Sequence, residues 1–169
     1  MAGSQSDGAL VQLSERLTNS TAFSNLFREG MDLVEETAAY LDGAGRVEAK
    51  ALERAISLTY ATESMRLTTR LMQLASWLLL HRAVKEGEMT LTQANREKTK
   101  VKLSAAEPGP DDMIAKLPQQ LQDLIARSMS LQARVRRLDI TIHAPASEHT
   151  TIGNPLVPQL NRLKAAFEQ

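Results

Sequence analysis

The segment ATESMRLTTRLMQLASWLLLHRAVKEG, from Ala61 to Gly87, carries the strongest periodic pattern in the sequence. It has no proline and no internal glycine, and its leucines recur at helical spacing, which predicts a helix with one face in a core. The predicted core row is Leu67, Leu71, Leu74 and Leu78. Between Leu74 and Leu80 apolar residues occupy nearly the whole circumference, so this part must be covered on more than one side. The cover is either two helices of the same chain or one helix and a second copy of the protein.

Two further helices are predicted around this segment, and together they indicate an all-α fold. The first covers residues 21–42, with Ser20 or Thr21 as its cap and glycines after its last turn. Its predicted core stripe is Phe23, Leu26, Phe27, Met31, Val34, Ala38 and Leu41. The central helix covers residues 47–87, about 60 Å at 1.5 Å per residue, and the third covers residues 118–139. The first connection is short, so the central helix must fold back along the first.

The segment between the second and third long helices is predicted to be mostly irregular. Thr90 and Gln93 have the spacing of a capping box, which predicts a short helix through about Lys98. Pro108-Gly109-Pro110 then indicates a loop.

The predicted domain organisation has three parts. Residues 1–20 form a flexible N-terminal segment, residues 21–139 form an antiparallel three-helix bundle with one long central helix, and residues 140–169 form a mobile C-terminal tail. The tail contains three prolines, which disfavour continuous helix. A short amphipathic motif within it is a candidate for binding a partner. Its residues are Leu156, Leu160 and Leu163.

Composition excludes several classes of protein. At 169 residues the chain fits one domain, and because it has no cysteine, disulfides and thiolate metal sites are excluded. The N-terminal residues lack the pattern of a secretory signal, and the apolar runs are too short to span a bilayer. We therefore expect a soluble, cytoplasmic protein that does not contact membranes.

Charge is balanced overall but unevenly placed. Residues 1–65 hold ten acidic and five basic side chains, whereas residues 66–139 hold eight acidic and thirteen basic ones. One interpretation is that an acidic early helix packs beside a basic later helix. The other is a basic surface that receives an acidic protein partner.

No pattern in the sequence predicts an enzyme, a metal site or a cofactor. His81, His143 and His149 lack ligand spacing, and the adjacent Glu35 and Glu36 point in directions about 100° apart on a helix. We therefore nominate no catalytic, cofactor-binding or metal-binding residue.

A charged cluster on the central helix, and the methionines with the single tryptophan, each have two interpretations. Glu63, Arg66 and Arg70 share one flank. They form either an ion-pair network with Asp32, Glu35 or Glu36 opposite, or an anion-binding site. The methionines either fill gaps between helices or form an adaptable binding surface, and Trp77 is an interface anchor if it is not fully buried.

Two segments resemble a known family. GMDLVEETAAYLDGAGR, from Gly30 to Arg46, and YATESMRLTTRLMQLASWLLLHRAVKEGEM, from Tyr60 to Met89, are similar to the RcdA family, the regulators of CtrA degradation of alphaproteobacteria. The resemblance implies a three-helix bundle that forms a homodimer and acts as a proteolysis adaptor. It also implies partners, namely the ClpXP protease, the response regulator CpdR and protein cargo such as CtrA, with recruitment to a cell pole.

A homodimer would explain the excess of apolar surface on the central helix. We expect the partner to contact the side away from the leucine row. The predicted dimer seam is Met72, Ala75, Ser76 and Leu79.

The alternative function is a helical DNA-associated regulator that uses the basic third helix on phosphates. Its candidate residues are Arg127, Arg134, Arg136 and Arg137. The neutral total charge and the absence of helix-turn-helix spacing disfavour it, so no nucleic-acid partner is expected.

Overall fold

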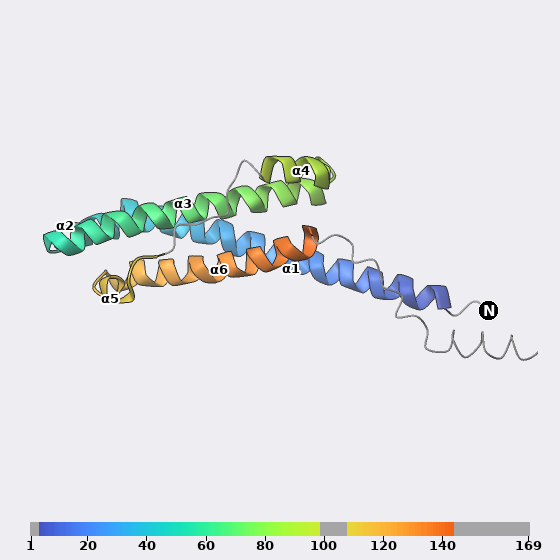
Figure 1. Ribbon diagram of the computed structural model, residues 1–169, viewed down its shortest axis with the longest axis horizontal. Helices are drawn as coiled ribbons and strands as arrows, with labels where there is room; N and C mark the ends of the chain where they lie inside the picture. The colour runs from blue at the N-terminus through green and yellow to red at the C-terminus, as the bar shows by residue number, and fades with distance from the viewer. Residues whose placement is uncertain (1–3, 99–107, 144–169) are drawn as a thin grey trace, which may run out of the picture. The chain divides into compact units, whose positions relative to one another are not determined.

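The structure is a computed structural model that describes residues 4–98 and 108–143 (Figure 1). These residues form helices and contain no strand, which confirms the prediction of an all-α fold. The helices are α1 (Ser4–Asp42), α2 (Ala44–Lys50), α3 (Arg54–Lys85), α4 (Leu91–Lys98), α5 (Asp111–Ile114) and α6 (Gln119–His143). The contacts divide the chain after Val135, within α6, and the packing described below is that of the unit ending there.

The core lies between α1, α3 and α6. The predicted row on α3 is buried, with exposed fractions of 4% or less for all four leucines, so this prediction is confirmed. Burial of each such side chain stabilises the fold by about 1.5–3 kcal/mol. The largest apolar contributions from the other two helices are Phe23, Leu26, Leu33 and Tyr40 of α1 and Leu121, Leu124, Ile125, Leu131 and Val135 of α6.

The face of α1 that enters the core is only partly the predicted one: Phe23 and Leu26 are buried as predicted, but the rest of the predicted stripe is not. Leu33, Thr37 and Tyr40 are buried, whereas Ala38 is exposed. The reason is the close approach of α3 at Gly30, where an added Cβ would lie 2.4 Å from Leu78 Cδ1. Because the helices approach on the side of Gly30, the neighbouring apolar stripe is left half-buried. Its members Phe27, Met31, Val34 and Leu41 remain partly accessible.

Side-chain contacts give the directions of the helices. Lys85, at the end of α3, donates a hydrogen bond to the carbonyl of Ser20 in α1, whereas Tyr40, near the end of α1, lies beside Tyr60, near the start of α3. Thus α3 runs antiparallel to α1 (Figure 1). Two ion pairs described below show that α6 also runs antiparallel to α1.

Two predicted helix boundaries are wrong. The first helix begins at Ser4 rather than at residue 20 or 21, since no proline or glycine between residues 9 and 22 interrupts it. The predicted helix over residues 47–87 is broken at residues 51–53, where Glu53 adopts an extended ψ of 152°. Tertiary packing accounts for this break, because α2 fits Gly45 against Tyr60, whose hydroxyl would lie 2.6 Å from an added Cβ. The flexibility assigned to residues 1–20 stays a prediction.

The end of α3 and the start of α4 were predicted correctly from nearby residues in the sequence. Gly87 has a φ of 77°, and the Glu88 N–H donates to the Ala83 carbonyl at 2.9 Å, which closes α3 in a Schellman motif. The capping box of α4 is also confirmed. The Thr90 N–H donates to Gln93 Oε1 at 2.9 Å, and the Gln93 N–H donates to Thr90 Oγ1 at 3.1 Å.

The C-terminal boundary of the helical region also differs from the prediction. α6 continues to His143, past the predicted end at residue 139, so residues 140–143 are helical rather than part of a tail. The remaining predicted tail, including its motif of Leu156, Leu160 and Leu163, lies outside the described residues.

Candidate protein-interaction surface

A row of large apolar side chains on α3 is exposed. Leu58, Met65, Met72 and Leu79 have exposed fractions of 71%, 72%, 67% and 52%. Because they are seven residues apart, close to two helical turns, they lie on one face of the helix, away from the buried leucines. We call these four residues the α3 apolar row. A row of large exposed apolar side chains along one helix face is a candidate protein contact surface.

Three hydroxyls beside the α3 apolar row are already hydrogen-bonded within the helix. The hydroxyls of Thr62, Thr68 and Ser76 each donate to the carbonyl four residues earlier in α3, at distances of 2.9–3.0 Å. Since these donors are already satisfied, a partner can cover them at little cost. The face is therefore less polar than its composition indicates.

A groove between α1 and α3 lies next to this row. Its volume is about 290 Å³. Met72 and Ala75, both in the predicted dimer seam, form part of its wall on α3. The half-buried stripe of α1, including Val34 and Leu41, forms the other wall. The groove can accept an aliphatic side chain from a partner.

The four predicted seam residues differ in their exposure to solvent. Met72 and Leu79 project from the exposed face, whereas Ala75 and Ser76 are half-buried. Trp77 is 1% exposed and stacks on His81 with ring centroids 3.9 Å apart, so it is a core residue and not an interface anchor.

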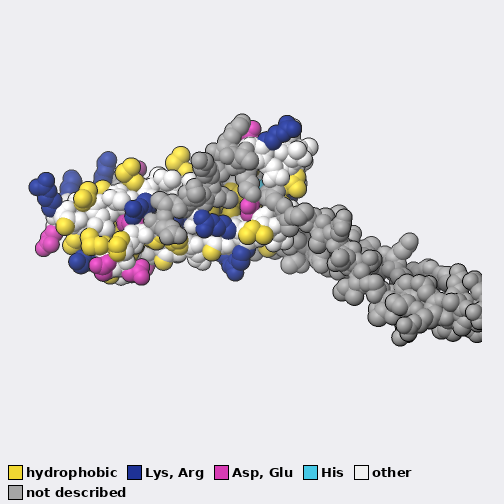
Figure 2. Space-filling model, viewed as in Figure 1, with side chains coloured by type: hydrophobic (Ala, Val, Ile, Leu, Met, Phe, Trp, Pro, Cys, Tyr) yellow, Lys and Arg dark blue, Asp and Glu magenta, His cyan; other side chains and the backbone are white. Residues whose placement is uncertain are grey.

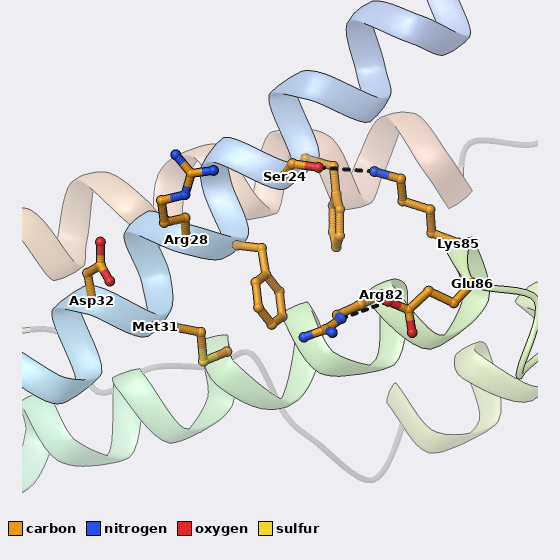
Figure 3. Close-up of a pocket in the computed structure, with 9 residues that line it drawn as sticks. Ser24, Arg28, Met31, Asp32, Arg82, Lys85 and Glu86 are labelled. Atoms are coloured by element: carbon orange, nitrogen blue, oxygen red, sulfur yellow. Dashed lines mark hydrogen bonds and ion pairs between the residues drawn. The ribbon is translucent and has the colours of Figure 1, made fainter.

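A second hollow of about 510 Å³ lies between α1 and the end of α3 (Figure 3). Phe23, Phe27 and Met31 supply its apolar lining. Arg82 lies over the Phe27 ring, 4.9 Å from the centroid, and Lys85 Nζ lies 5.4 Å from the Phe23 centroid. Cation–π contacts of this kind hold the charged groups at the rim.

The Glu63, Arg66 and Arg70 cluster forms inside the fold, and its predicted partners on α1 are wrong. Arg66 pairs with Glu63 at 2.6 Å, and the Gly109 N–H also donates to Glu63 Oε1, at 2.9 Å. Arg70 donates to Ser128 Oγ of α6 at 2.9 Å. Burial lowers the pKa of the Arg70 guanidinium, and the nearby Glu63 carboxylate opposes that effect. Because Glu63 and Arg70 are buried, the cluster joins α3 to its neighbours and is closed to a free anion.

The basic third helix and the acidic first helix pair with each other, as one interpretation of the charge pattern predicted. Arg127 of α6 lies 2.7 Å from Glu36 of α1, and Arg134 pairs with Glu29. The hydrogen bond from Arg127 lowers the pKa of Glu36. These two arginines already face carboxylates, which disfavours the alternative function of binding DNA phosphates.

The described residues offer no group of three or more His, Asp or Glu that would hold a metal. The ring of His81 lies in the core, with Nδ1 3.0 Å from the Trp77 carbonyl oxygen. No helix within residues 4–98 and 108–143 is both long and apolar enough to cross a membrane.

On the face shown in Figure 2, hydrophobic side chains reach the surface between charged ones. The fold and its surface thus define a class of all-helical protein with apolar contact faces on its long helix.

The family described as "Protein of unknown function (DUF1465)" matches residues 14–167. The solved structure of RcdA from Caulobacter crescentus CB15 is 52% identical, with a TM-score of 0.61, over 73% of this chain and 92% of that chain. The chain therefore belongs to the RcdA family. No curated protein matches it.

Sequence reasoning found half of the α3 apolar row. Leu58 and Met65 were missed, although a spacing of seven residues from Met72 and Leu79 is a visible signal. The second hollow was missed because Phe27 and Met31 were assigned to the core, and only the packing of α1 leaves them accessible.

Proposed function

We propose that this chain is a non-enzymatic adaptor that helps to deliver cell-cycle regulators such as CtrA to the ClpXP protease, together with the response regulator CpdR. It would act in the cytoplasm, with recruitment to a cell pole. The observation that carries the proposal is the 52% identity to RcdA over 92% of that chain. An adaptor needs contact surfaces rather than a reactive centre, and the exposed faces of α3 fit that requirement.

The adaptor is proposed to work as a homodimer through the α3 apolar row. Met72 and Leu79 are large and exposed, and Met72 lines a groove that fits one aliphatic side chain. In a symmetric dimer a residue of one copy enters the groove of the other, and the reverse contact follows from the two-fold axis. Burial of each such Leu or Met would contribute about 1.5–3 kcal/mol.

A reconstituted degradation reaction tests the proposal. Purified ClpXP, CpdR and fluorescently labelled CtrA are mixed with or without the chain, and loss of full-length CtrA is followed with time. The chain should shorten the half-life of CtrA only when protease and CpdR are both present. RcdA from Caulobacter crescentus serves as the positive control. An unchanged half-life with this chain, in a reaction that RcdA accelerates, would reject the adaptor function.

A further inference from the structure

The second hollow has an apolar base that two helices build together. Phe23 is 8% exposed and rests on Trp77, with centroids 6.3 Å apart, so it forms a fixed floor. Phe27 and Met31 are half-buried and stay accessible from the hollow. Its volume of about 510 Å³ is enough for one or two large side chains. An aromatic floor beside an adaptable methionine is well suited to an apolar side chain.

The rim of this hollow is positively charged. It carries Arg28, Arg82 and Lys85 against Asp32 and Glu86. The Glu86 carboxylate is already paired, since it lies 2.9 Å from the Arg82 guanidinium.

The other two cations retain hydrogen-bonding capacity. Lys85 donates only to neutral oxygens, the Ser20 carbonyl at 3.0 Å and Ser24 Oγ at 3.2 Å, which leaves it a third N–H. Arg28 has no hydrogen-bond or ion-pair partner among the described residues. Figure 3 shows that Arg28 comes from α1, whereas Lys85 comes from α3 on the other side of the hollow. A segment lying between the two helices would therefore meet a free donor from each.

The geometry points to a docking site for a short acidic peptide segment that carries a large apolar side chain. The apolar side chain packs on Phe27 and Met31, and flanking carboxylates accept hydrogen bonds from Arg28 and Lys85. The role of this site as a cargo contact rests on the adaptor function proposed above. The binding itself is a property of the hollow and is measured without the protease.

Fluorescence anisotropy with the full chain tests the site. The probe is a fluorescein-labelled short peptide in which one Leu and one Phe are flanked by glutamates. Two control peptides replace either the glutamates by lysines or the two apolar residues by serines. Only the first peptide should bind well, and added salt should weaken its binding because salt screens exposed charges. Equal binding of all three peptides would overturn the proposal.

Two variants with matched controls locate the binding in the hollow. Arg28→Glu should weaken the acidic peptide roughly fivefold or more and improve the lysine peptide, since the exposed charge is reversed without loss of an internal contact. Arg54→Glu makes the same charge change at an exposed position outside the hollow and should leave both affinities unchanged. Phe27→Ala should weaken the acidic peptide roughly tenfold, whereas Val47→Ala should not. Circular dichroism and the melting temperature show whether Phe27→Ala stays folded.

The degradation reaction separates the two proposals. Arg28→Glu should slow delivery of CtrA, and Arg54→Glu should not. If peptide binding depends on Arg28 but the wild-type chain fails to accelerate degradation, the docking site stands and the adaptor function fails. If the wild-type chain accelerates degradation but peptide binding ignores Arg28→Glu, the docking site is wrong and the adaptor function stands.

Discussion

Arg70 of α3 donates a hydrogen bond of 2.9 Å to Ser128 Oγ of α6, and both side chains are buried. Ser128 Oγ in turn donates to the carbonyl of Ile125 at 2.7 Å. This short polar chain lies among leucines, so it favours one register of α6 against α3. A shift of either helix would bury polar atoms without these partners.

Ser128→Ala should destabilise the fold by about 1–3 kcal/mol, because it removes an acceptor from a buried guanidinium. The free energy of unfolding from urea denaturation measures the effect. Thr62→Ala is the control, since that hydroxyl is exposed and bonds only within its own helix, and it should change stability by less than about 0.5 kcal/mol. Equal stability of the two variants would contradict a register role for Ser128.

The two tyrosines should titrate at unusually high pH. Burial raises the pKa of Tyr40, which also donates a hydrogen bond of 2.7 Å to Glu48, and burial raises the pKa of Tyr60. These are the only tyrosines in the sequence, so tyrosinate absorbance reports on them alone. The native protein should ionise at higher pH than the urea-unfolded chain, whose tyrosines titrate near pH 10, about the usual value.

Stability should fall accordingly as pH rises above about 10, because the unfolded state then loses phenolic protons that the folded state keeps. Tyr40→Phe should make this alkaline decline shallower, measured by urea denaturation at several pH values. Coincident titration of the native and unfolded chains would contradict the prediction.

Leu79→Glu should convert the proposed dimer into a folded monomer, because it places a charge in an apolar contact. Leu79 is 52% exposed, so the substitution should leave the melting of the monomer nearly unchanged. Mass from light scattering is the measurement. Val47→Glu, at a residue 71% exposed on α2, is the matched control and should keep the dimer mass. A dimer that survives Leu79→Glu would exclude this seam.

Deletion of residues 145–169 tests the C-terminal motif of Leu156, Leu160 and Leu163. If that motif contacts the protease machinery or cargo, the truncated chain should melt at the same temperature as the full chain but deliver CtrA more slowly. The triple substitution of the three leucines by serine should reproduce the defect without shortening the chain. Normal delivery by both variants would remove the motif from the proposal.

Features that depend on neighbours in the sequence were predictable. The leucine row from Leu67 to Leu78, the glycine that ends α3 and the capping box of Thr90 and Gln93 each follow from residues within about two turns. The RcdA resemblance was likewise readable from contiguous segments, and it carried most of the functional inference.

Features that depend on contacts between distant residues needed the tertiary structure. The close approach of Gly30 and Leu78 decides which face of α1 is buried, and so leaves Phe27 accessible. The predicted long helix is broken at residues 51–53, which contain no proline or glycine, because α2 packs Gly45 against Tyr60. Glu63 and Arg70 turn inward to partners 46 and 58 residues away, respectively, which no spacing reveals. Helical periodicity indicates that a face is apolar. Which of two adjacent apolar stripes is covered, and which remains free to bind, depends on the helices that pack against it.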